Sequence, residues 1–107
     1  MITETNKIDG IAVDKKNNAL MLLISDHLDW DDEYNHLITL QGKINTYISF
    51  IETEQYKENY PDISFNYFII EIRFMFPVTE KCMQFLNAVS EQIKPLGIAI
   101  FVEQREK

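Results

Sequence analysis

The strongest constraint in the sequence is the segment at residues 65–76, in which every second residue from Phe68 to Phe76 is large and apolar. Alternation is typical of a β-strand, because successive side chains of a strand point to opposite faces of the sheet. The apolar set, expected to face the core, consists of Phe68, Ile70, Ile72, Phe74 and Phe76. The opposite set is mixed and consists of Tyr67, Ile69, Glu71, Arg73 and Met75. Such a strand requires a sheet with one well-covered face.

Three further apolar segments complete the predicted sheet. Residues 8–13 and 19–25 are joined by polar residues 14–18, which predicts a hairpin of antiparallel strands. Residues 19–24 are apolar on both faces, so we expect this strand in the interior of the sheet, where both faces are covered at least in part. Residues 98–102 predict the last strand, after a helix stop at Pro95-Leu96-Gly97.

Between the strands, apolar residues recur at steps of three and four, which is typical of amphipathic helices. The first predicted helix begins near Asp31, with Asp29 or Asp31 as its N-cap and Lys43 outside its apolar stripe. That stripe consists of Tyr34, Leu37, Leu40, Gln41, Ile44, Tyr47, Ile48 and Ile51. The second helix is capped by Thr79 and buries Cys82, Phe85, Leu86, Val89 and Ile93.

The resulting order, β-β-α-β-α-β, predicts an α+β protein of two layers. We expect a four-stranded mixed sheet with two helices on one face, because each helix connects two parallel strands. The length of 107 residues suits a single domain over residues 1–107.

The sheet face without helices would expose apolar side chains, namely Met21, Leu23, Tyr67, Ile69 and Phe101. Exposed apolar patches of this kind usually mark an interaction surface, and we expect a homodimer through it. The alternative is that the N-terminal segment or the loop at residues 54–64 folds across this face.

The charge is acidic, with 10 Lys and Arg against 17 Asp and Glu and a net charge of −7. Five carboxylates lie within residues 26–33. Such a surface repels phosphate backbones and anionic lipids, so we expect no binding to nucleic acid or to membranes. A basic protein is the partner that this charge favours, and the alternative is that the charge serves only solubility.

A candidate metal site consists of Asp26, His27, Asp29 and His36, where the second strand passes into the first helix. Side chains converge at strand ends in α/β sheets, and imidazole and carboxylate groups are ligands of divalent metals. Their spacing matches no established metal motif. The alternative is structural: the acids cap the helix, Trp30 packs under its first turn, and His27 hydrogen-bonds to a neighbouring aspartate.

Other catalytic motifs are absent from the sequence, including phosphate loops, Cys pairs and nucleophile elbows. A single cysteine, Cys82, and the lack of a readable signal peptide predict a cytoplasmic protein. We expect a non-enzymatic protein-interaction module, of regulatory or immunity-like character. The alternative is a metal- or small-ligand-binding protein, or an enzyme, that uses the four-residue cluster.

The motif Ile-Ser-Asp-His-Leu-Asp-Trp at residues 24–30, followed by His36-Leu37, resembles a family of small uncharacterised bacterial proteins. The similarity extends to Tyr60-Pro61 and to Ile-Glu-Ile at residues 70–72. That family is described as a domain of unknown function. The resemblance therefore implies a bacterial, cytoplasmic, stand-alone domain and transfers no catalytic residue.

Overall fold

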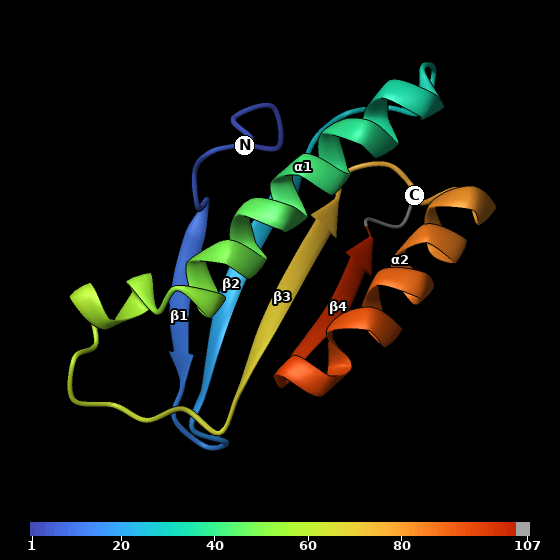
Figure 1. Ribbon diagram of the computed structural model, residues 1–107. Coiled ribbons are helices and arrows are strands. Elements are labelled where there is room, and N and C mark those ends of the chain that lie inside the picture. The colour runs from blue at the N-terminus through green and yellow to red at the C-terminus, as the bar shows by residue number, and fades with distance from the viewer. Residues whose placement is uncertain (105–107) are drawn as a thin grey trace.

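The sheet contains four strands, which lie side by side in the order of the sequence (Figure 1). The computed structural model describes residues 1–104. The strands are β1 (Gly10–Asp14), β2 (Ala19–Asp26), β3 (Tyr67–Phe74) and β4 (Ile98–Gln104). The helices are α1 (Glu33–Glu52) and α2 (Glu80–Ile93), with short 3-10 helices η1 (Gln55–Glu58) and η2 (Lys94–Leu96). The predicted α+β class and element order are confirmed.

Strand pairing follows from the connections. The hairpin makes β1 and β2 antiparallel, with Gly10 opposite Leu23, whereas β3 is parallel to both β2 and β4. Parallel neighbours need a long crossover, which α1 supplies between β2 and β3 and α2 supplies between β3 and β4. The doubly apolar β2 lies between β1 and β3, so its predicted interior position is confirmed.

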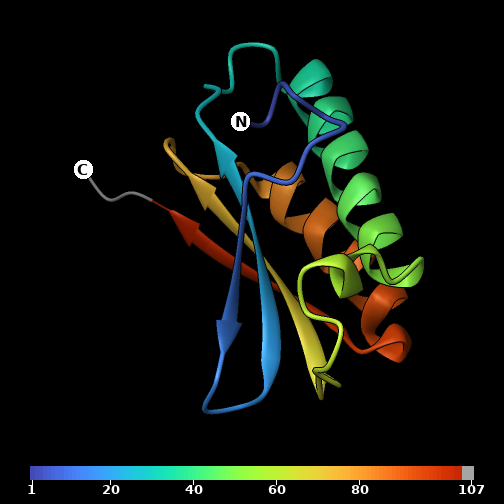
Figure 2. The same cartoon turned by 90° about the vertical axis from the view of Figure 1, so that its left-hand side faces the viewer.

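Both helices cover the same face of the sheet (Figure 2). The alternation of β2 and β3 directs Leu20, Leu22, Ile70 and Ile72 into a core in which all four are fully buried. Phe76 is an exception to the predicted core face: it lies beyond the end of β3 and is 39% exposed. The alternation therefore holds only as far as the strand is paired.

The buried face of α1 differs from the predicted stripe. Tyr34 and Gln41 are exposed, and His36 and Lys43 are buried instead. The buried residues of α1 are His36, Leu40, Lys43, Ile44, Tyr47 and Ile51. The orientation of the helix therefore buries two polar residues, His36 and Lys43, and both have hydrogen-bond partners.

Among residues 1–104, no helix is both long enough and apolar enough to cross a membrane.

The N-terminal segment and the loop after α1 also lie on the helix side (Figure 2). Ile2 is fully buried in the core, and Tyr56 of η1 packs against Phe65 and Phe68. The sequence left open whether either segment folds across the opposite face of the sheet, and neither does. Within the described residues, that face carries no second layer.

Candidate functional site

A buried pair of polar side chains lies where β2 passes toward α1. Asp26 and His36 are 1% and 3% exposed, and 2.6 Å separates His36 Nε2 from Asp26 Oδ2. The other oxygen, Asp26 Oδ1, accepts from the Leu28 amide at 3.0 Å. Trp30 stacks on the His36 ring, with centroids 3.7 Å apart. Trp30 thus covers one face of the His36 ring. This agrees in part with the structural alternative, in which Trp30 packs under the first turn of the helix.

The protonation of this pair follows from its partners. His36 Nδ1 lies 2.9 Å from the carbonyl oxygen of Asp29, which can only accept, so Nδ1 carries a hydrogen. One further proton then lies between His36 Nε2 and Asp26 Oδ2, whichever group holds it. The pair is electrically neutral overall, which is how two ionisable groups are accommodated in an apolar interior.

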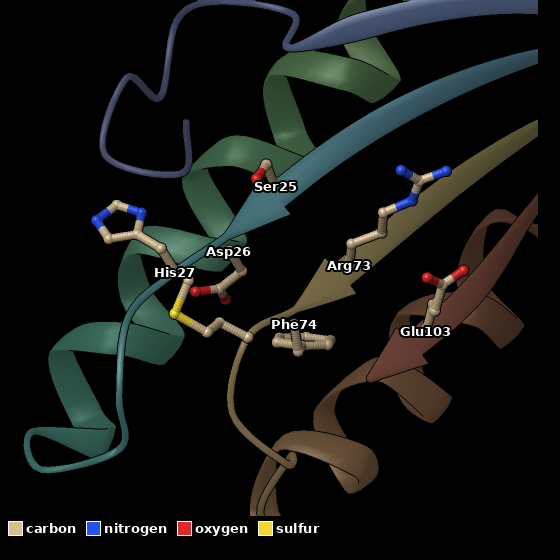
Figure 3. Close-up of a pocket in the computed structure, with 7 residues that line it drawn as sticks. Ser25, Asp26, His27, Arg73, Phe74 and Glu103 are labelled. Atoms are coloured by element: carbon tan, nitrogen blue, oxygen red, sulfur yellow. The ribbon is translucent and has the colours of Figure 1, made fainter. Parts of the chain in front are cut away.

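The other two predicted ligands do not join this pair. The Asp29 carboxylate accepts from the Asp31 amide at 3.0 Å and is exposed. His27 points away from the Asp26 carboxylate (Figure 3), and its Nδ1 is buried without a hydrogen-bond partner. The expected hydrogen bond from His27 to a neighbouring aspartate is therefore wrong. Among residues 1–104, no three His, Cys, Asp or Glu side chains converge to hold a metal ion.

The N-cap of α1 is Asp32, where the sequence suggested Asp29 or Asp31. Asp32 Oδ1 accepts from the Asn35 amide at 3.2 Å. Asp29 instead stabilises the turn before the helix, through the Asp31 amide. The loop places several interchangeable acids together, and only the backbone geometry selects the one that caps.

A cavity of about 340 Å³ opens at the carboxyl ends of β2, β3 and β4 (Figure 3). Its lining consists of Ser25, Asp26, His27, Arg73, Phe74, Met75 and Glu103. Open sheets with parallel strands usually bind ligands at this end. Of the four predicted ligands, Asp26 and His27 line this cavity, so a small ligand in it would meet these two.

The sheet surface away from the helices is mainly apolar at its centre, and we call it the bare face. Its central side chains are Met21, Leu23, Tyr67, Ile69, Ala99 and Phe101. Phe101 is 57% exposed, and the other four predicted interface residues are half-buried. Nothing in residues 1–104 lies over them.

One carboxylate is buried in the middle of the bare face. Glu71 is 7% exposed, and its Oε2 accepts from Arg73 Nε at 2.7 Å. This hydrogen bond and the nearby charge raise the pKa of Arg73, which therefore remains a cation. Both residues of the pair lie on β3, two positions apart on the same face of the strand. The bare face therefore carries one ion pair among its apolar side chains and no uncompensated buried charge.

A second polar network, which the sequence analysis missed, holds the N-terminal segment against α1. The fully buried Lys43 Nζ donates to the carbonyl oxygens of Glu4 and Lys7, both at 2.7 Å, and to Asp9 at 2.8 Å. Burial acts to raise the pKa of Asp9, but hydrogen bonds from Lys43, from the N-terminal ammonium of Met1 and from the Ser25 amide together outweigh it and lower the pKa. Every donor of the ammonium is used, so this network is structural.

Fold and surface together define a two-layer α+β protein with one helix-covered face and one bare apolar face. The chain belongs to the family of unknown function DUF6572, whose model matches residues 1–106. Searches of curated proteins and of solved structures found no match to the chain. The predicted resemblance to a family of unknown function is confirmed.

Proposed function

We propose that this protein is a non-enzymatic interaction module that self-associates through the bare face. The observation that supports the proposal is the apolar centre of this face, which the chain leaves uncovered within residues 1–104. Contiguous apolar surface on a folded chain usually marks a protein interface. A second copy is the simplest partner, because a two-fold axis lets one patch cover itself.

The size of the face fits a weak dimer. Four strands spaced about 4.8 Å apart, with about seven residues rising about 3.3 Å each, span about 450 Å² per copy. Two copies would bury about 900 Å², close to the roughly 1,000 Å² of small specific interfaces. We therefore expect a weak dimer whose population depends on protein concentration.

Size-exclusion chromatography with light scattering tests the proposal over a range of protein concentrations. Met21→Lys and Ile69→Lys place a charge on the bare face and are expected to abolish the dimer. Ile38→Lys is the matched control, because Ile38 is 49% exposed on α1, in the other layer. Circular dichroism shows whether each variant folds, and Phe101→Ser replaces any variant that does not.

A monomer at every concentration would contradict the proposal. So would a dimer that survives all three bare-face substitutions, because its interface would lie elsewhere. The net charge of −7 also favours a basic partner protein. The effect of added salt on association distinguishes such a partner from a second copy of this chain. Added salt weakens association between opposite charges and strengthens association between two equally acidic copies.

Small-ligand binding in the strand-end cavity is the second candidate function. Its support is the position of the cavity at the carboxyl ends of three parallel strands and its volume of about 340 Å³. Thermal melts with Zn²⁺, Mn²⁺ and Ca²⁺ test the metal form of this candidate. We expect no rise in Tm, because the carboxylate oxygens of Asp26 and the ring nitrogens of His36 already have partners. These partners are each other and backbone groups. A rise that His27→Ala removes would instead support the metal site.

A further inference from the structure

The bare face is not uniform from edge to edge. One row of neighbouring residues runs Gly10, Leu23, Glu71, Phe101 from β1 to β4. The next row runs Ala12, Met21, Ile69, Ala99. In the first row the side chain is a large aromatic at the β4 edge and absent at the β1 edge. The largest projection of the face is therefore at the β4 edge, and a depression lies along β1. A second hollow of about 280 Å³ lies beside Phe101, over β3 and β4.

The depression is a hollow of about 200 Å³ along β1, which we call the edge hollow. Its lining consists of Gly10, Ile11, Ala12, Met21, Leu22, Leu23, Glu71 and Arg73. Ala12 is exposed there, and Gly10 offers no side chain to fill the space. The projection is Phe101, which is 57% exposed. A large apolar side chain so exposed is stabilised when it enters a hollow of this kind.

We propose that two copies pack their bare faces together about a two-fold axis that runs parallel to the strands, between β2 and β3. This inference rests on the proposed self-association and adds its geometry. Rotation about that axis exchanges the β1 edge with the β4 edge and keeps each row in place. Phe101 of each copy then lies over the edge hollow of its partner, so one contact occurs twice.

The other two-fold axis in the plane of the face runs across the strands. It places β4 over β4 and β1 over β1, so Phe101 lies over the partner's β4 and both edge hollows stay empty. Empty hollows forfeit apolar burial and dispersion contacts. The axis parallel to the strands is therefore the one that fills both edge hollows.

The first test is a pair of matched substitutions, read as dissociation constants by analytical ultracentrifugation. Phe101→Ala is expected to weaken the dimer at least tenfold. Phe76→Ala is its control, because Phe76 is an exposed phenylalanine beyond β3. Ala12→Phe fills the edge hollow and is expected to weaken the dimer likewise. Equal dissociation constants for Phe101→Ala and Phe76→Ala would overturn the inference.

The second test reads the orientation directly. In a Cys82→Ala background, Ala12→Cys and Ala99→Cys are made as separate proteins, both at exposed positions of one row. A bis-maleimide that spans the roughly 10 Å between packed sheets is then added. A mixture of the two proteins is expected to cross-link, whereas either protein alone is not.

The outcomes separate the two proposals. Cross-linking of Ala99→Cys with itself, in a protein that dimerises, would overturn the orientation and leave the proposed function intact. A dimer without cross-links in the mixture would also overturn the orientation. A protein that remains monomeric at all concentrations would overturn both.

Discussion

His36 is held by contacts that leave neither ring nitrogen free. Its Nε2 lies 2.6 Å from Asp26, its Nδ1 faces the Asp29 carbonyl oxygen, and Trp30 covers the ring. A histidine so enclosed orients the loop between β2 and α1. Asp26 and His36, two of the four residues that the sequence marked for chemistry, therefore serve structure in this arrangement.

Asp26→Ala is expected to lower the free energy of unfolding by about 3 kcal/mol, because it leaves His36 Nε2 and the Leu28 amide without partners in a buried place. Urea unfolding followed by circular dichroism measures the loss. Asp31→Ala, an exposed acid of the same loop, is the control and should change stability by less than about 0.5 kcal/mol. Equal losses for the two variants would argue against a structural pair.

Cys82 sets a limit on stability at high pH. Burial, and then the charge of Asp26, raises the pKa of its thiol from 9.0 to about 12. Above pH 9 the unfolded chain loses this proton first, so the folded state binds more protons and the free energy of unfolding falls as pH rises. Cys82→Ala is expected to reduce the fall in Tm between about pH 8 and about pH 10. An unchanged pH dependence would contradict this linkage.

At the scale of elements, both helices begin at a side-chain cap. Thr79 accepts from the Cys82 amide at 3.0 Å, as the sequence predicts, and Asp32 caps α1. Thr79 is the only capping residue near its helix start in the sequence, whereas α1 is preceded by a run of acids. A local pattern thus locates a helix start well and selects among equivalent caps poorly.

Asp32→Ala is expected to cost about 1 kcal/mol, the usual value for a lost N-cap. Thermal unfolding should show a lower Tm for Asp32→Ala than for Asp31→Ala. Thr79→Ala is a positive control of the same kind on α2. If Asp31→Ala proved the more damaging of the two, a different residue would cap α1.

The burial of Lys43 was predictable in principle from its spacing. His36, Leu40, Lys43 and Tyr47 follow one another at steps of four, three and four, which is one face of a helix. The predicted stripe left Lys43 outside that face and included Tyr34 and Gln41 instead. The deciding partners, Asp9 and the N-terminal carbonyl groups, lie more than 30 residues away in sequence.

At the scale of the whole molecule, the acidic charge and the bare face have opposite effects on self-association. Two copies of net charge −7 repel each other, while apolar burial favours their association. The proposed dimer is therefore expected to tighten as salt screens the repulsion.

A concentration series of thermal melts measures this linkage. Tm should rise with protein concentration, because the dimer binds only folded chains, and the rise should be larger in high salt than in low salt. Ile69→Lys should remove the concentration dependence, and Ile38→Lys should keep it. A Tm that is independent of concentration in the unmodified protein would count against self-association.

The sequence by itself determined the elements, their order and the bare face, because strand and helix periods are local properties that adjacent side chains impose on the backbone. The interior place of β2 followed from its two apolar faces in the same way. Only the tertiary structure decided that His36 meets Asp26 while His27 points away, that Asp32 caps α1, and that Lys43 is buried beside Asp9. These depend on the rotation of a helix about its axis and on distances between remote segments, and a small rotation exchanges one polar side chain for another without changing the period of the sequence.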